Sequence, residues 1–135
     1  MAYTPTEGRK KEVSTRLIKP TIPQLDVTRV LEHVRHWDPE HELGDYVFLF
    51  DSGVAQYLLV DEESHHIYYA ALILRKPSLR CTITLKEPHD FFDESGDNHI
   101  HLIQSQSKTL SSVNHQEIEF LKQILRNRGY RFAKE

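Results

Sequence analysis

Residues 46–85, YVFLFDSGVAQYLLVDEESHHIYYAALILRKPSLRCTITL, contain four short apolar runs separated by turn-forming residues. Short runs rich in β-branched and aromatic residues are typical of β-strands, and Asp, Ser, Gly and Pro between them are typical of turns. The pattern therefore predicts an antiparallel meander. With one further run near the C-terminal end, we expect five strands, near residues 46–51, 55–60, 66–75, 80–86 and 98–105.

The third predicted strand, residues 66–75, is apolar on both faces. Tyr69 and Ile73 would point to one side of it, and Tyr68 and Leu72 to the other. An antiparallel sheet with one wet face would instead alternate with polar residues. We expect both sides to be covered, by one helix on each face, by tail or loop segments, or by a second copy of the chain. The surplus apolar face predicts a homodimer.

Two amphipathic helices are expected to flank the sheet. In the first, residues 26–37, Asp26 is placed to cap the N-terminus. The second is expected from about 114 to 128, with Asn114 as its cap and Gly129 in the left-handed position that closes it. The predicted fold class is α+β, a five-stranded antiparallel meander sheet between an N-terminal and a C-terminal helix.

Length and composition indicate a single α+β domain over residues 13–132, preceded by a flexible tail over residues 1–12 that lacks apolar periodicity. The net charge of -3 does not by itself favour a polyanionic partner. No apolar run approaches the roughly 20 residues of a membrane-spanning helix. No apolar segment follows the basic residues near the N-terminus, so we expect no secretory signal and a cytoplasmic protein. Cys81 is predicted to be buried as a small hydrophobe.

Histidines offer the clearest pattern for metal binding. His99 and His101 are alternate residues of a predicted strand, so they share a face and could bind a metal with help from the preceding loop, whose candidate ligands are His89, Asp90, Asp93 and Asp97. The spacing is not that of a known metal motif, and surface imidazoles explain the pair as well. We therefore expect no metal and no cofactor. His65 and His66 are predicted to lie in a solvated turn.

Charged residues are segregated along the chain. Residues 38–66 contain eight acidic residues and no Lys or Arg, which could form an acidic loop rim for a basic partner. Basic residues gather near both ends of the sequence: Arg9, Lys10, Lys11, Arg16, Lys19, Lys122, Arg126, Arg128, Arg131 and Lys134. If the two groups met in space, they would form a positive face able to hold phosphates.

The function expected from these patterns is that of a small non-enzymatic interaction or regulatory protein, acting through the apolar sheet face and the acidic rim. Its partner would be another protein, a second copy of itself, or both, with Tyr68, Phe91 and Phe92 as contact residues. No catalytic residue is assigned, because no nucleophile motif or glycine-rich phosphate loop is present. Two alternatives stay open: a metal-assisted hydrolase or nuclease using His99 and His101, and a nucleic-acid accessory protein using its basic ends.

Overall fold

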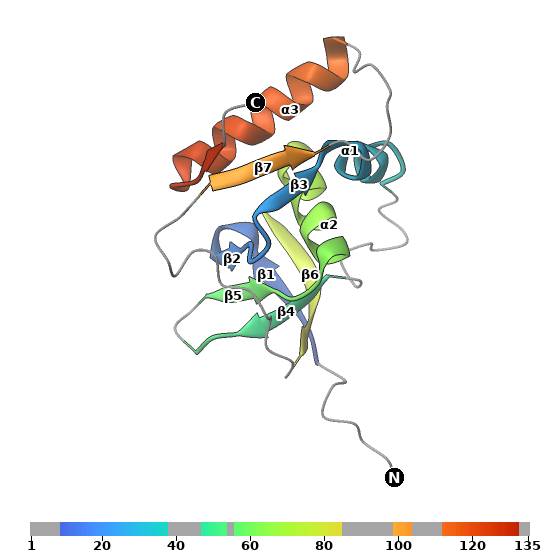
Figure 1. The fold of residues 1–135 in the computed structure, drawn as a ribbon. Helices are drawn as coiled ribbons and strands as arrows, with labels where there is room; N and C mark the ends of the chain where they lie inside the picture. The colour runs from blue at the N-terminus through green and yellow to red at the C-terminus, as the bar shows by residue number, and fades with distance from the viewer. Residues whose placement is uncertain (1–8, 38–46, 54–55, 85–98, 104–111, 133–135) are drawn as a thin grey trace.

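The computed structural model describes residues 9–37, 47–53, 56–84, 99–103 and 112–132, and these residues form eight strands, a 3-10 turn and three α-helices (Figure 1). In chain order the elements are β1 (Arg9–Ser14), η1 (Thr15–Leu17), β2 (Ile18–Lys19), β3 (Gln24–Asp26), α1 (Val27–Arg35), β4 (Phe48–Asp51), β5 (Tyr57–Leu59), α2 (Glu62–Ile73), β6 (Ser78–Thr84), β7 (His99–Ile103), α3 (Ser112–Asn127) and β8 (Arg131–Phe132).

The larger sheet is mixed, so the predicted antiparallel meander is wrong. Its strand order is β1-β6-β4-β5-β2. β1 pairs with β6, and β4 with β5, in antiparallel fashion, whereas β4 with β6 and β2 with β5 are parallel. β7 does not join this sheet: it lies between β3 and β8, parallel to both. Parallel neighbours need a crossover connection, which a meander lacks.

Residues 66–75 were predicted as a strand, but most of them belong to helix α2. The Asp61 side chain caps this helix by accepting a hydrogen bond from the Ser64 N–H, and Glu62 and Glu63 follow in its first turn, where negative charge suits the helix dipole. Every residue from Ser64 to Ile73 is buried. A helix that is apolar on all sides gives the same short apolar run as a strand buried on both faces, so periodicity does not separate the two.

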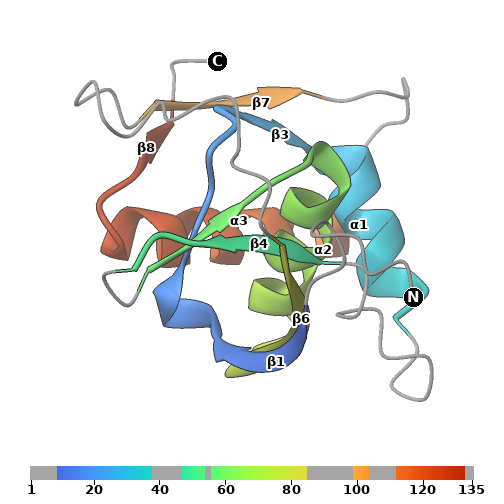
Figure 2. The ribbon, with the colours of Figure 1, turned by 90° about the horizontal axis from the view of Figure 1, so that it is seen from below.

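α2 occupies the centre of the molecule (Figures 1 and 2). The larger sheet curves around one side of it, and α1, α3 and β3 contact it elsewhere. Cys81 lies in the core, as predicted. Because the sequence 67–73 is enclosed within one chain, the surplus apolar face that motivated a homodimer is absent, and the dimer prediction keeps no support from it.

The two predicted flanking helices are present. Asp26 caps α1, accepting hydrogen bonds from the N–H groups of Thr28 and Arg29 at 3.1 and 3.4 Å. α3 begins at Ser112, two residues before Asn114, so the prediction of Asn114 as its cap is wrong. Its predicted end is confirmed. Gly129 has a φ of +99°, a conformation that side chains disfavour, and the Tyr130 N–H closes the helix on the Leu125 carbonyl at 3.0 Å.

The predicted tail extends too far along the chain. Residues 9–12 belong to β1, which pairs with β6 from Arg9↔Ile83 to Ser14↔Ser78. The stretch lacks apolar periodicity because β1 is an edge strand with exposed side chains at positions 10–12. Hydrogen bonds between the backbones of β1 and β6 hold the strand in place, and they form whatever the side chains are.

No described helix is long and apolar enough to span a membrane.

Candidate functional site

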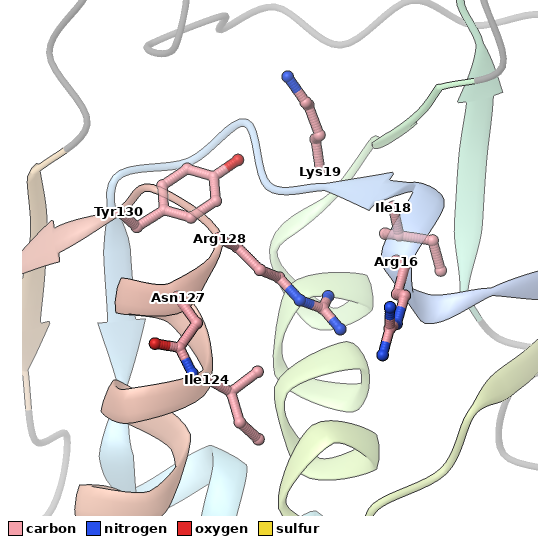
Figure 3. Close-up of a pocket in the computed structure, with 7 residues that line it drawn as sticks. All are labelled: Arg16, Ile18, Lys19, Ile124, Asn127, Arg128 and Tyr130. Atoms are coloured by element: carbon pink, nitrogen blue, oxygen red, sulfur yellow. The ribbon is translucent and has the colours of Figure 1, made fainter.

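A pocket of about 510 Å³ lies between the η1–β2 segment and the end of α3 (Figure 3). It is lined by Arg16, Ile18, Lys19, Ile124, Asn127, Arg128 and Tyr130. Three of these side chains are cationic and none is acidic. Both sides of the pocket combine cationic and apolar side chains.

Local hydrogen bonds place the two sides of the pocket. The Ser14 side chain caps η1 by accepting from the Arg16 N–H at 3.3 Å, and the Thr15 N–H donates to the Pro77 carbonyl at 3.0 Å. The chain then enters β2, whose Ile18 pairs with Tyr57 of β5. On the other side, Ile124 and Asn127 of α3 and Arg128, the first residue after it, lie close together because residues three and four apart are neighbours on a helical turn.

Arg128 connects the pocket to the core. Its Nη1 donates to the Thr15 carbonyl at 2.8 Å and to the Tyr68 hydroxyl at 2.7 Å, and that hydroxyl donates to the Ile18 carbonyl at 3.3 Å. Burial raises the pKa of Tyr68 to about 12, and the positive charge of Arg128 only partly opposes this effect. Tyr68 therefore stays a neutral hydroxyl that accepts from Arg128 and donates to Ile18.

The pocket retains hydrogen-bond donors that the fold does not use. The Nη1 group of Arg128 has two hydrogens, and its two bonds account for both, whereas Nε and Nη2 have no partner among the described residues. The same holds for the guanidinium of Arg16, which points into the gap toward Arg128 (Figure 3). Asn127 accepts from Gln123 Nε2 at 3.2 Å through its carbonyl oxygen, which leaves its amide NH₂ as a donor. Such a set of donors favours an anion.

The two basic groups, whose meeting the sequence left as a condition, come together in part. Arg16 and Lys19 from one group share the pocket with Arg128 from the other. Lys11 instead donates to the Tyr57 hydroxyl at 2.8 Å. Lys122 and Arg126 each lie 5.6 Å from the ring centre of Phe132, so a basic and aromatic pairing that the sequence did not indicate exists on α3 and β8.

The prediction that His65 and His66 lie in a solvated turn is wrong, since both are about 1% exposed within α2. The Nδ1 of His65 donates to the Asp61 carbonyl at 2.7 Å. Its Nε2 accepts from the N–H groups of Thr21 and Ile22 at 2.8 and 3.1 Å. Burial lowers the pKa of His65 to about 4, so the ring is neutral near pH 7. Its hydrogen bonds connect Thr21 and Ile22, which follow β2, to α2.

Two buried polar atoms in α2 lack partners among the described residues: Nδ1 of His66 and the hydroxyl of Tyr69. Burial lowers the pKa of His66 and raises that of Tyr69 well above its usual value, so both side chains are neutral near pH 7. Neither residue lines the pocket between η1–β2 and α3.

The acidic rim is described only at the start of α2. There Glu63 contacts Nε2 of His33 and lies 3.7 Å from Nη1 of Arg29. Burial opposes ionisation of Glu63, but the hydrogen bond to His33 and the nearby positive charges outweigh it and hold the pKa of Glu63 below its usual value. The acidic residues at 38–45 lie outside the described residues.

Of the remaining predicted site residues, Tyr68, His99 and His101 lie in the described part of the chain. Tyr68 has no exposed area, and its assignment as a partner contact stays a prediction that a buried position does not favour. Phe91 and Phe92 lie outside the described residues, as do the loop ligands proposed for His99 and His101. Both histidines belong to β7, with His101 exposed, and the described residues hold no group of three side chains suited to a metal.

No family model, curated protein or solved structure matches this chain.

Proposed function

We propose that this protein is a non-enzymatic binding protein that recognises a partner through an anionic group, held in the pocket between η1–β2 and α3. The observation that carries the proposal is the set of unused donors that Arg16, Arg128 and Asn127 bring to the pocket lining, with no carboxylate in it. The binding role expected from the sequence is kept, but its surface changes. The residues that were expected to form an apolar sheet face belong to α2 instead, and they are buried there.

Charge balance supports an anionic ligand. Two guanidinium groups that point into one gap repel each other when the pocket is empty, and an anion between them removes that repulsion. Arg128 is fixed by Thr15 and Tyr68 before any ligand arrives, so little side-chain entropy is lost when its other donors are used.

The cytoplasm stays our proposed compartment, since the lone buried Cys81 fits a reducing environment.

The proposal is tested by titrating the protein with inorganic phosphate and following binding by calorimetry or backbone NMR. Arg16→Gln removes one pocket charge from an exposed residue whose side chain has no partner in the described structure. Arg35→Gln is the matched control, because it removes the same charge from an exposed position on α1. A charge-assisted hydrogen bond is worth about 1.5–3 kcal/mol, so Arg16→Gln is expected to weaken binding roughly tenfold or more.

The control variant should bind phosphate as the wild type does. Equal unfolding midpoints for the two variants would show that the loss does not come from misfolding. Equal weakening by both substitutions, or a wild type that binds neither inorganic phosphate nor any organic anion tried in its place, would overturn the proposal.

A further inference from the structure

The lining of the pocket also defines the class of anion. We infer that the ligand of this pocket is a phosphate monoester whose organic group is apolar or aromatic. This inference rests on the proposed anion-binding function.

The charge of the lining favours a dianion. Arg16 and Arg128 bring two positive charges to the gap between them, and no lining residue carries a negative one (Figure 3). A carboxylate or a phosphodiester would bring a single negative charge. A phosphate monoester carries about -1.5 to -2 near pH 7, since its second pKa is near 6.

The directions of the donors favour a group with three terminal oxygens. The Nε and Nη2 edge of Arg128 forms a fork that can hold two oxygens. The Asn127 amide comes from the end of α3, and the Arg16 guanidinium comes from the η1–β2 side of the pocket (Figure 3). When that fork holds both oxygens of a carboxylate, the carboxylate could not offer a further oxygen to Arg16. A phosphate monoester has three terminal oxygens and could.

The apolar side chains in the lining indicate that the anion carries an organic group. Ile18, Ile124 and the ring of Tyr130 line the same cavity as the cations. Its volume of about 510 Å³ lies within the roughly 300–1,000 Å³ that sites for small organic ligands occupy. Inorganic phosphate would leave this apolar surface wet, whereas the ring of an aryl phosphate or a nucleotide would cover it.

The test compares Kd values for phenyl phosphate, inorganic phosphate, benzoate and diphenyl phosphate at pH 7.5. We expect phenyl phosphate to bind at least about tenfold more tightly than each of the other three, a difference that corresponds to about 1.4 kcal/mol. Arg16→Gln should weaken phenyl phosphate and inorganic phosphate alike. Ile124→Ala should weaken phenyl phosphate alone, and Ile124→Phe, which fills the cavity instead of enlarging it, provides a second variant if Ile124→Ala fails to fold.

The outcomes separate the inference from the proposed function. Equal Kd values for phenyl phosphate and inorganic phosphate, both weakened by Arg16→Gln, would overturn the organic body and leave the anion site standing. Benzoate or diphenyl phosphate binding as tightly as phenyl phosphate would overturn the dianion. No binding of any of the four anions would overturn the proposed function itself.

Two further ligands identify the source of the monoester. Adenosine 5′-monophosphate represents a free nucleotide, and a 5′-phosphorylated tetranucleotide represents the end of a nucleic acid strand. Each is compared with its unphosphorylated form, and we expect the phosphorylated form to bind at least about tenfold more tightly in both pairs. Tighter binding of the nucleotide assigns a small-molecule ligand, and tighter binding of the tetranucleotide assigns a strand end; either result supports the monoester. Equal binding of phosphorylated and unphosphorylated forms would overturn it.

Discussion

Nη1 of Arg128 lies 2.7 Å from the hydroxyl oxygen of Tyr68, so a pocket residue directly after α3 is hydrogen-bonded to the buried central helix. The same hydroxyl donates to the Ile18 carbonyl at 3.3 Å. One buried tyrosine thus joins both walls of the pocket, and its hydrogen bonds connect binding to folding.

Tyr68→Phe should therefore destabilise the protein. The substitution removes the acceptor for a charged donor and the donor to Ile18 while leaving the ring in place. We expect a loss of about 1–3 kcal/mol in the free energy of unfolding, measured by urea denaturation. An unchanged free energy of unfolding would show that the hydroxyl network adds nothing to stability.

Tyr69→Phe is the matched control for Tyr68→Phe, because it should not lower the free energy of unfolding. Tyr69 is also fully buried, but its hydroxyl has no hydrogen-bond partner among the described residues. Removing an unsatisfied buried hydroxyl should leave stability unchanged or raise it by about 1 kcal/mol. A loss as large as that for Tyr68→Phe would reveal a partner for the Tyr69 hydroxyl and contradict this assignment.

The buried His65 should make the protein lose stability in acid. Its pKa is about 4 in the folded protein and near 6.5 in an unfolded chain, so between these values the unfolded state binds more protons. Its contribution is complete above pH 6.5 and decreases as the pH falls toward 4, by about 3 kcal/mol in all.

Urea denaturation between pH 7.5 and pH 4.5 measures this slope. Glu63 and His66, whose pKa values are also lowered, contribute to it in the same direction. His65→Gln should flatten the slope, whereas His101→Gln, at an exposed position, should leave it as in the wild type. Identical slopes for the two variants would contradict a buried neutral His65.

Leu121→Ala and Lys122→Ala test the buried side of α3. Leu121 has no exposed area, so truncation should cost about 2–5 kcal/mol. Lys122, whose side chain is 12% exposed, pairs with Glu119 at 3.2 Å and lies over the ring of Phe132, so its removal should cost about 1 kcal/mol, less than that of Leu121. Thermal or chemical unfolding of the two variants gives the comparison, and similar losses would mean that the helix is packed on another face.

Local signals in the sequence predicted the flanking helices well. Asp26 caps α1 through its own side chain, and Gly129 ends α3 through its own backbone freedom, so neither depends on distant residues. The apolar run after Ser64 was misassigned because its environment, enclosed on all sides, is set by the whole fold. The capping signal at Asp61, followed by two glutamates, was present in the sequence and favours a helix.

The candidate site depends on topology more than on any motif. Arg16 and Arg128 are far apart in sequence, and their residue types alone indicated only a conditional positive face. Their meeting requires β2 to pair with β5 beside the end of α3, which the predicted meander did not contain. The contact from Arg128 to Tyr68 was likewise hidden, because Tyr68 was placed on a strand.

The most direct test of the binding site is a backbone NMR titration of the labelled protein with phenyl phosphate. We predict saturable shift changes centred on Arg16, Lys19, Asn127, Arg128 and Tyr130, and their loss in Arg16→Gln at the same ligand concentration. Arg35→Gln should reproduce the wild-type shifts. Shift changes centred on other elements, or changes that persist unaltered in Arg16→Gln, would contradict an anion site between η1–β2 and α3.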